Sequence, residues 1–504
     1  MGSRYRARVA LLTVVALLAA LGLPGMGMAA DVSVQAAVFA PDAYEPDDDF
    51  DDAYVYRPAV DGNTFHSYRT FDGVNGVADD EYDVIAVDVA VAGTPIWVEV
   101  MYVDGRLDTY VRIYDAAGTE LVEYDDNDYW YATYSEGAYF IAPTAGRYYV
   151  EVDNRDMMCA YELFITVGNA RRVFGVDRFE TAAEVSRLQW DNTGNAYYGY
   201  GYGPGDIVVA NGLNPADALA GGSLAAQLGG VLLLTHPDHL PAATYDEIVR
   251  VTESLYWEDH EVHVHVLGGT AAVSDDVFED LQGIRHVTHV HRIAGANRYA
   301  TAAAIGDVMA DEIGVSTSAY LVNGTAWADA LAVAPVAAWA NAPVLMTMKD
   351  SVPAETAAWL SDNGVTDVYI IGGESVVGAP VAAALDPLYT VHRISGDNRY
   401  ATAKEVALHG VNDHGMNGQL ATLASGESFA DALSAAPIGW WTGAPLLLTP
   451  KDTLHAQVAA YFDESGAIGT DADDGIGCYV LGGPGAVSDT VYAAFRDHWK
   501  ELLP

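Results

Sequence analysis

The chain has few basic residues. Its 504 residues include 24 Lys and Arg against 70 Asp and Glu, so the formal net charge is −46. Proteins that bind nucleic acid neutralise phosphates with a basic surface, and this charge balance argues against that class. An anionic partner would be repelled at low salt unless divalent cations bridge the two surfaces or salt screens them over a Debye length, roughly 3 Å at 1 M.

Cysteine is nearly absent. Cys159 and Cys478 are the only two, and they lie in different regions of the chain. An exported chain would allow one disulfide between them. Two cysteines without a partner spacing do not make a disulfide framework, so two buried thiols are the favoured interpretation.

Signatures of catalysis and of nucleotide binding are also missing. The sequence contains no G-x-S-x-G elbow, no C-x-x-C, no G-x-G-x-x-G and no G-x-x-x-x-G-K-[ST]. Acidic pairs occur throughout so acidic a chain, so glycosidase carboxylates cannot be singled out. We predict a protein that is not an enzyme and has no organic cofactor.

Only one long apolar run is present, and it lies at the N-terminus. Arg4, Arg6 and Arg8 precede apolar residues 9–21, and the small residues Gly27 and Ala29 follow. This order is typical of a secretory signal rather than of a membrane span, which needs about 20 apolar residues. We predict a signal peptide over 1–29, a linker over 30–43 and a mature chain without a transmembrane segment.

A long motif occurs three times, beginning at Arg172, Arg292 and Arg393. The three copies read R-V-F-G-V-D-R-F-E-T-A, R-I-A-G-A-N-R-Y-A-T-A and R-I-S-G-D-N-R-Y-A-T-A. Each is followed by an A-D-A-L segment (residues 216–219, 328–331 and 430–433), an apolar run that ends in Thr, and a strand-like run that ends in a Gly pair. Internal repetition at this spacing indicates domain-sized modules.

Within each module, short apolar runs alternate with longer Ala-rich stretches at helical spacing. Residues 206–210, 215–227 and 231–235 are one example. Apolar strands that alternate with helices predict a parallel sheet in an α/β fold.

These motifs together resemble the type 2 cell-wall-binding repeat of Gram-positive surface proteins. The resemblance implies three flavodoxin-like or Rossmann-like units, over 170–285, 286–388 and 389–504, in a pseudo-threefold module. It also implies noncovalent retention on an anionic wall polysaccharide. The first copy departs from the pattern at Asp177, at Phe179 and in an aromatic insertion over 197–202, which puts a wall ligand there in doubt.

The repeated arginines have two interpretations. Three guanidinium groups can meet the phosphate or carboxylate of a polymer. Alternatively, each braces its turn by bonding carbonyl groups or by pairing with an A-D-A-L aspartate, Arg399 with Asp431 for example, and this structural role is favoured. The three arginines are Arg178, Arg298 and Arg399.

The Gly pairs end their strands at the carboxyl edge of a parallel sheet, where open α/β folds place ligands. The competing interpretation is a tight turn that needs positive φ. The pairs are Gly268 and Gly269, Gly372 and Gly373, and Gly482 and Gly483.

The region 44–168 differs in kind and alternates short strand-like runs with Gly, Asp and Asn turns. An antiparallel β-sandwich is predicted. Y-E-P-D-D at 44–48, D-x-x-D at 80–83 and A-G-R-Y-Y-V-E-V at 145–152 resemble the bacterial pre-peptidase C-terminal domain. That resemblance implies a calcium site; a solvated acidic surface is the equal alternative. The implied ligands are Glu45, Asp47, Asp48, Asp80 and Asp83.

Histidines cluster before the second repeat. His260, His263 and His265 precede a Gly pair, and His286, His289 and His291 precede the repeat itself, which suggests a zinc site. The spacing at 260–263 is one residue short of H-E-x-x-H. His263 and His265 share a strand face, with neither a carboxylate nor a third ligand specified by spacing, so surface histidines are favoured over a metal site.

We therefore expect a secreted, noncatalytic cell-surface protein that displays an acidic β-sandwich from three wall-binding repeats. Two alternatives stay open. One is a wall-glycan hydrolase with its active site at a Gly-pair edge, and the other is a soluble adhesin or scaffold that binds external polysaccharide or protein.

Overall fold

The computed structural model describes residues 54–498 with gaps. The described ranges are 54–56, 64–71, 73–74, 77–78, 82–89, 94–105, 110–125, 135–153, 159–168, 170–190, 205–253, 261–314, 316–465 and 478–498. The predicted signal peptide and linker lie outside them, as do Glu45, Asp47, Asp48 and Asp80. None of the helices in these ranges combines the length and apolarity that a membrane crossing requires.

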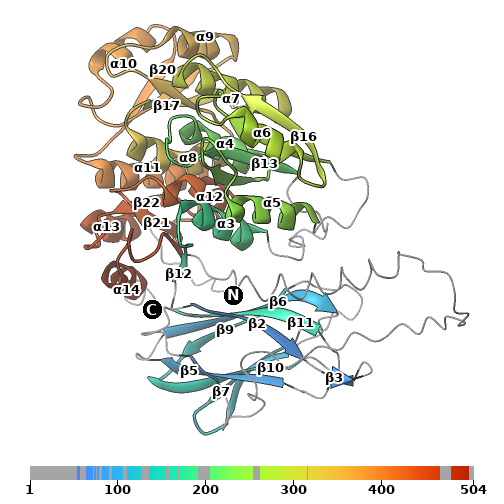
Figure 1. The fold of residues 1–504 in the computed structure, drawn as a ribbon. Coiled ribbons are helices and arrows are strands. Elements are labelled where there is room, and N and C mark those ends of the chain that lie inside the picture. The colour runs from blue at the N-terminus through green and yellow to red at the C-terminus, as the bar shows by residue number, and fades with distance from the viewer. Residues whose placement is uncertain are drawn as a thin grey trace, which may run out of the picture. The chain divides into compact units, whose positions relative to one another are not determined.

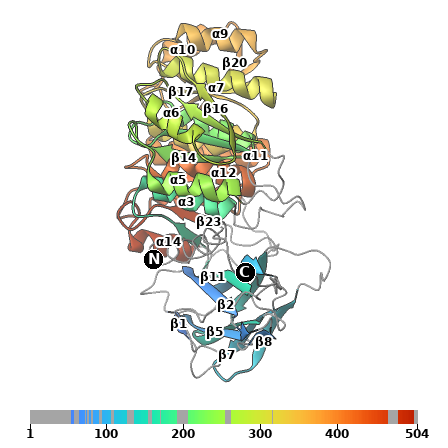
Figure 2. The ribbon, with the colours of Figure 1, turned by 45° about the vertical axis from the view of Figure 1, so that its right-hand side comes forward.

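The N-terminal strands form two sheets that share one core. One sheet has the order β1-β5-β10-β7-β8 and the other β2-β11-β6-β9. Among the strands described here, β1 and β5 pair in parallel and the others pair antiparallel. Alternate residues such as Val87 and Val150 from the first sheet and Val98 and Leu163 from the second are buried in one apolar cluster. Figures 1 and 2 show the sheets lying face to face. The strands are β1 (Tyr54–Tyr56), β2 (Thr64–Phe71), β5 (Tyr82–Val89), β6 (Thr94–Gly105), β7 (Tyr110–Asp115), β8 (Glu120–Asp125), β9 (Ser135–Ala142), β10 (Gly146–Asp153) and β11 (Cys159–Val167), with a separate pair β3 (Gly73–Val74) and β4 (Val77–Ala78).

The repeats follow the alternating strand and helix pattern predicted from the sequence. The first contains β12 (Ala170–Val173), α3 (Arg178–Gln189), β13 (Asp206–Asn211), α4 (Ala218–Gln227), β14 (Val231–Thr235), α5 (Ala242–Glu253), β15 (Val262–Leu267) and α6 (Asp275–Gln282). The second contains β16 (Val287–Ile293), α7 (Arg298–Glu312), β17 (Ser318–Asn323), α8 (Trp327–Trp339), β18 (Val344–Thr347), α9 (Ala354–Asp362), β19 (Asp367–Ile371) and α10 (Ala379–Leu385). The third contains β20 (Thr390–Ile394), α11 (Arg399–His414), β21 (Ala421–Ser425), the 3₁₀ helix η2 (Asp431–Ser434), α12 (Ala435–Thr442), β22 (Leu446–Thr449), α13 (Ala456–Glu464), β23 (Cys478–Leu481) and α14 (Asp489–His498).

Each repeat gives its opening strand to the sheet of the repeat before it. The sheet β14-β13-β15-β16 takes β16 from repeat 2, and β18-β17-β19-β20 takes β20 from repeat 3. The third sheet, β12-β23-β21-β22, takes β12 from repeat 1, with Val173 opposite Leu481. The exchange therefore closes into a ring, and each of these three sheets contains strands of two repeats.

Helices α4, α8 and the η2–α12 segment pack against one another between the three sheets (Figure 1). Small residues allow this close approach. A Cβ on Gly222 of α4 would lie 3.0 Å from the Cβ of Ala436, and one on Gly439 of α12 would lie 2.5 Å from the Cβ of Pro335. These contacts join the three repeats through one buried apolar cluster.

Candidate ligand site at the repeat junctions

The repeated opening motif forms a turn that leads from one sheet to the next repeat. Its Asn or Asp caps the following helix: the side chain of Asn398 accepts hydrogen bonds from the backbone N–H groups of Tyr400 and Ala401. The motif threonine holds the other side of the turn, since Thr402 Oγ1 accepts from the N–H of Gly396 at 3.1 Å. A Cβ on Gly396 would lie 2.4 Å from the Cβ of Ala401, so the turn requires glycine there.

The other two copies make the same contacts. Asn297 and Asp177 cap their helices, and Thr301 and Thr181 accept from Gly295 and Gly175. The departures in the first copy therefore keep the capping geometry, because a carboxylate accepts the same bonds as an amide oxygen. The aromatic insertion over 197–202 lies outside the described residues.

Each motif arginine donates to a backbone carbonyl of its own repeat. Arg178 bonds the carbonyl of Gly212 at 2.6 Å and Arg399 that of Gly426 at 2.5 Å, and Arg298 bonds Gly324 in the same way. These carbonyls follow strands β13, β17 and β21 directly. The arginines thus brace the carboxyl edge of the sheet, which is one of the two interpretations drawn from the sequence.

The aspartate facing each arginine belongs to the preceding repeat. Burial raises the pKa of Asp329 to about 6, and the Arg399 guanidinium partly offsets that rise. Burial likewise raises the pKa of Asp217 and Asp431. At both residues, a hydrogen bond with a threonine and the charge of an arginine oppose this rise in pKa. The pairs are Asp217 with Arg298, Asp329 with Arg399 and Asp431 with Arg178.

The sequence-based pairing of Arg399 with Asp431 is therefore wrong. Asp431 faces Arg178, and the partner of Arg399 is Asp329. The reason is the strand exchange: β20 lies in the sheet of repeat 2, so the turn after it starts beside the A-D-A-L segment of repeat 2.

The first glycine of each Gly pair has positive φ, at 93°, 101° and 104° for Gly268, Gly372 and Gly482. A Cβ on Gly372 would also lie 2.6 Å from Asp329 Oδ2. These positions therefore need glycine both for the turn and to admit the aspartate. The tight-turn interpretation accounts for them, and a ligand at the Gly pairs stays a prediction.

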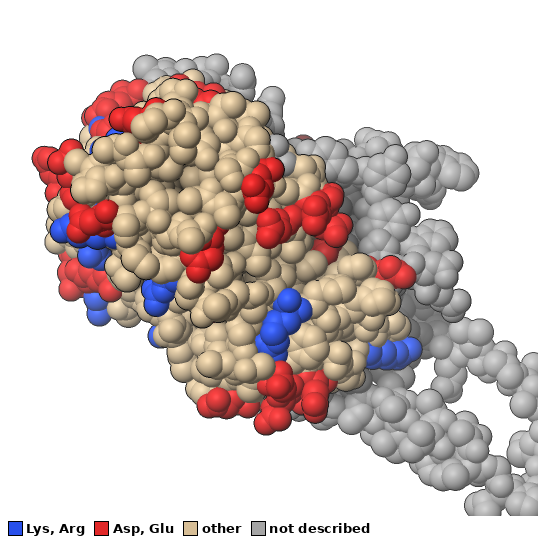
Figure 3. Space-filling view, turned by 90° about the horizontal axis from the view of Figure 1, so that it is seen from above, with Lys and Arg blue, Asp and Glu red and all other residues tan. Residues whose placement is uncertain are grey.

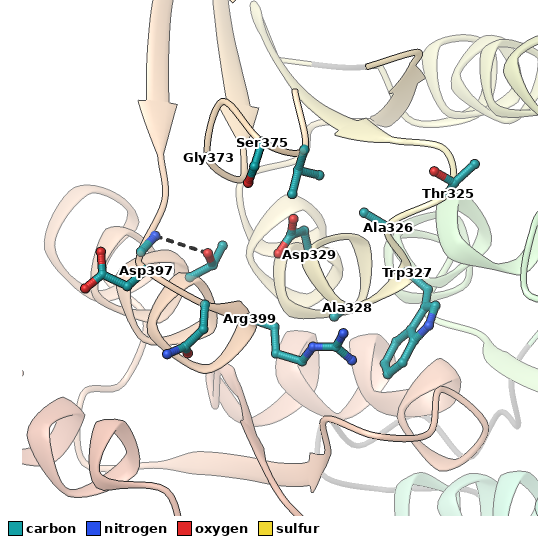
Figure 4. Close-up of a pocket in the computed structure, with 13 residues that line it drawn as sticks. Thr325, Ala326, Trp327, Ala328, Asp329, Gly373, Ser375, Asp397 and Arg399 are labelled. Atoms are coloured by element: carbon teal, nitrogen blue, oxygen red, sulfur yellow. Dashed lines mark hydrogen bonds between the residues drawn. The ribbon is translucent and has the colours of Figure 1, made fainter. Parts of the chain in front are cut away.

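A pocket of about 220 Å³ opens at the junction of repeats 2 and 3. Repeat 2 contributes Trp327, Asp329, Gly373 and Ser375, and repeat 3 contributes Arg399 from the start of α11. In Figure 4, Asp329 and Ser375 lie on one side, and the Arg399 guanidinium lies beside the indole of Trp327, whose ring centre is 5.1 Å from its Cζ. The junction thus combines an aromatic face, a cation, a buried acid and a hydroxyl.

The two other junctions differ at the same positions. Pro215 stands where repeat 2 has Trp327, so the junction of repeats 1 and 2 has no aromatic residue there. At the junction of repeats 3 and 1, the Cζ of Arg178 lies 5.6 Å from the centre of the Phe429 ring, and Phe174 lies over Gly483. A Cβ on Gly483 would be 2.8 Å from the Phe174 ring, so this side chain covers the Gly-pair edge.

Sequence reasoning missed Trp327 and Ser375. Trp327 could have been noticed in the sequence, because the residue directly before A-D-A-L differs among otherwise similar repeats. It is Pro215 in repeat 1, Trp327 in repeat 2 and Phe429 in repeat 3. Ser375 gives no such signal, since only the folded junction places it opposite Arg399.

The remaining predicted site residues lie elsewhere. Asp83 is buried in β5 and accepts a hydrogen bond from the Tyr161 hydroxyl. The other four proposed calcium ligands are outside the described residues, and the calcium site stays a prediction. Cys478 is buried in β23, where its sulfur accepts from the N–H of Ala421 at 3.3 Å.

Comparison with known proteins identifies the repeats. The model of the family described as Cell wall binding domain 2 (CWB2) matches residues 172–278, 292–382 and 393–492. The chain is 29% identical over 303 residues to N-acetylmuramoyl-L-alanine amidase LytC of Bacillus subtilis (strain 168), which covers 59% of this chain and 55% of LytC. It is 28% identical over 285 residues to an amidase enhancer of the same organism, which covers 56% of this chain and 35% of that protein. The chain thus spans about half the length or less of these relatives.

The structure of Cwp6 from Clostridium difficile matches with a TM-score of 0.55 and 20% identity, over 84% of this chain and 68% of that one. At this identity the likeness concerns the fold alone. With the family match, it confirms the predicted α/β repeats.

Proposed function

Because the chain belongs to the Cell wall binding domain 2 family, we propose that its repeats hold a secreted, noncatalytic protein on a wall polymer. Retention is noncovalent, and the N-terminal β region, which resembles a pre-peptidase C-terminal domain, is the part displayed. The polymer is an anionic polysaccharide, and the pocket between repeats 2 and 3 is its principal site.

The composition of that pocket carries the proposal. An indole face packs against the apolar face of a sugar ring, whereas a guanidinium donates two parallel hydrogen bonds to a phosphate or carboxylate. Trp327 and Arg399 supply both within one opening, and Ser375 adds a hydroxyl at its rim. Since Arg399 also braces Gly426, its position is fixed before any ligand arrives.

The overall charge opposes binding to an anionic polymer. Figure 3 shows one face of the molecule on which Asp and Glu side chains lie scattered among uncharged residues, together with a few Lys and Arg. With a net charge of −46, long-range repulsion is expected at low salt. Calcium or another divalent cation that bridges protein and polymer is the simplest remedy, and the acidic N-terminal region is its proposed site.

We expect residues 170–504 to sediment with purified cell walls and residues 30–168 to remain in solution, because the family match lies within the first fragment. Binding of the full mature chain should weaken in chelator and return with Ca²⁺. Quantification of bound and free protein on gels tests both points. Retention of the 30–168 fragment alone would overturn the assignment.

A bulky residue at the pocket rim should block the ligand without disturbing the core. Ser375 is exposed and lines the pocket, so we expect Ser375→Trp to lower wall affinity at least tenfold with little change in Tm. Ala271 is the exposed counterpart after the Gly pair of repeat 1, and Ala271→Trp serves as the matched control. Equal wall affinities of the two variants would remove this pocket from the site.

A further inference from the structure

Four histidines come together where the opening strand of repeat 2 joins the sheet of repeat 1. Strands β15 and β16 pair in parallel, with His263 opposite His289 and His265 opposite His291. The rings of His263 and His289 lie 5.0 Å apart, and that of His291 is 5.6 Å from His263. Residues at this spacing lie on one face of the sheet.

A carboxylate completes the group. Glu261 Oε2 lies 3.6 Å from His263 Nε2, and one ligand atom each from Glu261, His263 and His289 can be chosen so that all three lie within 4.8 Å of one another. Tetrahedral zinc with bonds of about 2.0–2.1 Å places its ligand atoms about 3.4 Å apart. Small side-chain rotations therefore bring the three atoms onto one ion.

The structure supplies both elements that spacing along the chain did not specify. The carboxylate is that of Glu261, the residue directly before β15. The third ligand, His289, lies 26 residues after His263 in the sequence, and the pairing of β15 with β16 places the two opposite each other.

The cluster is not required by the repeat fold. When the repeats are aligned on their Gly pairs and opening arginines, the counterparts of Glu261, His263 and His289 in repeat 2 are Val365, Asp367 and Thr390. The second repeat builds the same strand pair without them.

The cluster is accessible to a cation. The His263 side chain is 35% exposed and the Glu261 side chain is 64% exposed.

We propose that Glu261, His263 and His289 form a binding site for a zinc-class divalent metal ion, with the ring of His291 beside it. Imidazole with carboxylate suits zinc, whereas calcium prefers oxygen ligands alone. The ion would join β15 of repeat 1 to β16 of repeat 2 and so reinforce the exchanged strand. This role is separate from the polymer pocket between repeats 2 and 3.

Isothermal titration of the full mature chain with ZnCl₂ tests the proposal, with excess CaCl₂ present to occupy sites made of carboxylates alone. We expect one saturable site, weakened more than tenfold in His263→Gln and in His289→Gln and less in Glu261→Gln. Zinc should raise Tm by several degrees in the parent chain and not in the histidine variants.

The matched control is the double variant His236→Gln, His239→Gln. The rings of these two histidines also stack, with their centres 4.3 Å apart, and they lie in repeat 1 like His263. Circular dichroism without metal shows whether each variant is folded. The proposal would be overturned if zinc binding did not saturate in the presence of calcium, or if it persisted in both His263→Gln and His289→Gln. An equal loss of zinc affinity in the control variant would also overturn it.

Discussion

A chain that begins at residue 174 is expected to melt about 6 °C below one that begins at residue 170. The two differ only by β12, which completes the sheet of repeat 3. Removal of the buried side chains and hydrogen bonds of β12 should lower the free energy of unfolding by about 4 kcal/mol, which gives a Tm change of this order in a large domain. Thermal unfolding of the two chains measures it.

The contacts of β12 explain so large an effect for four residues. Ala170 and Val173 are buried, and the Ala170 carbonyl accepts a hydrogen bond from the Tyr492 hydroxyl at 2.8 Å. The Arg172 guanidinium lies 4.4 Å from the centre of the Tyr492 ring. Without β12, strand β23 becomes an exposed edge, so the shorter chain should also self-associate.

The comparison is a minimal pair because both chains lack the whole N-terminal β region. A chain that begins at residue 30 is the reference for any contribution from that region. Equal melting of the chains that start at 170 and 174 would mean that the ring is held together by its central helices alone.

Local sequence predicted the α/β modules because their signals are local. The A-D-A-L helices, the buried apolar strands and the turn glycines all read directly from spacing along the chain. The strand exchange could not be predicted in the same way. An edge strand such as β20 has the same sequence pattern whichever sheet it completes, and nothing in the sequence of one repeat says which neighbouring sheet receives its opening strand.

The same limit explains the error at the arginines. Sequence paired Arg399 with the aspartate of its own repeat because both belong to one copy of the motif. The interaction is instead formed across a junction. The proximity of Glu261 and His289 could not be predicted for a related reason, since the two become neighbours only when β15 and β16 pair.

Arg399→Ala should destabilise the chain by about 2 kcal/mol, because it removes the cation that stabilises the buried carboxylate of Asp329. The variant also loses the hydrogen bond to Gly426 and the contact with Trp327. Denaturant unfolding gives the free energy. If Arg399 served the polymer alone, the variant would unfold like the parent while its wall affinity fell.

Double-mutant cycles identify the partner. Arg399→Ala combined with Asp329→Asn should show a coupling free energy of about 1–3 kcal/mol, since the two side chains face each other across the junction. Arg399→Ala combined with Asp431→Asn should be additive within about 0.5 kcal/mol. Coupling to Asp431 in place of Asp329 would contradict the exchanged arrangement.

The pH dependence of the unfolding free energy tests whether Arg399 stabilises the ionised form of Asp329. Burial raises the pKa of Asp329 to about 6, so this group favours the folded state when protonated, and that stability is lost as pH rises from about 3.9 through 6. Arg399 limits the loss by stabilising the carboxylate. Arg399→Ala should therefore cost most at pH 8 and only about 1 kcal/mol at pH 5, where the carboxyl is largely neutral and the hydrogen bond to Gly426 is the main loss. In the Asp329→Asn background the cost should be the same at both values, and a cost that changed with pH there would assign the titration to another group.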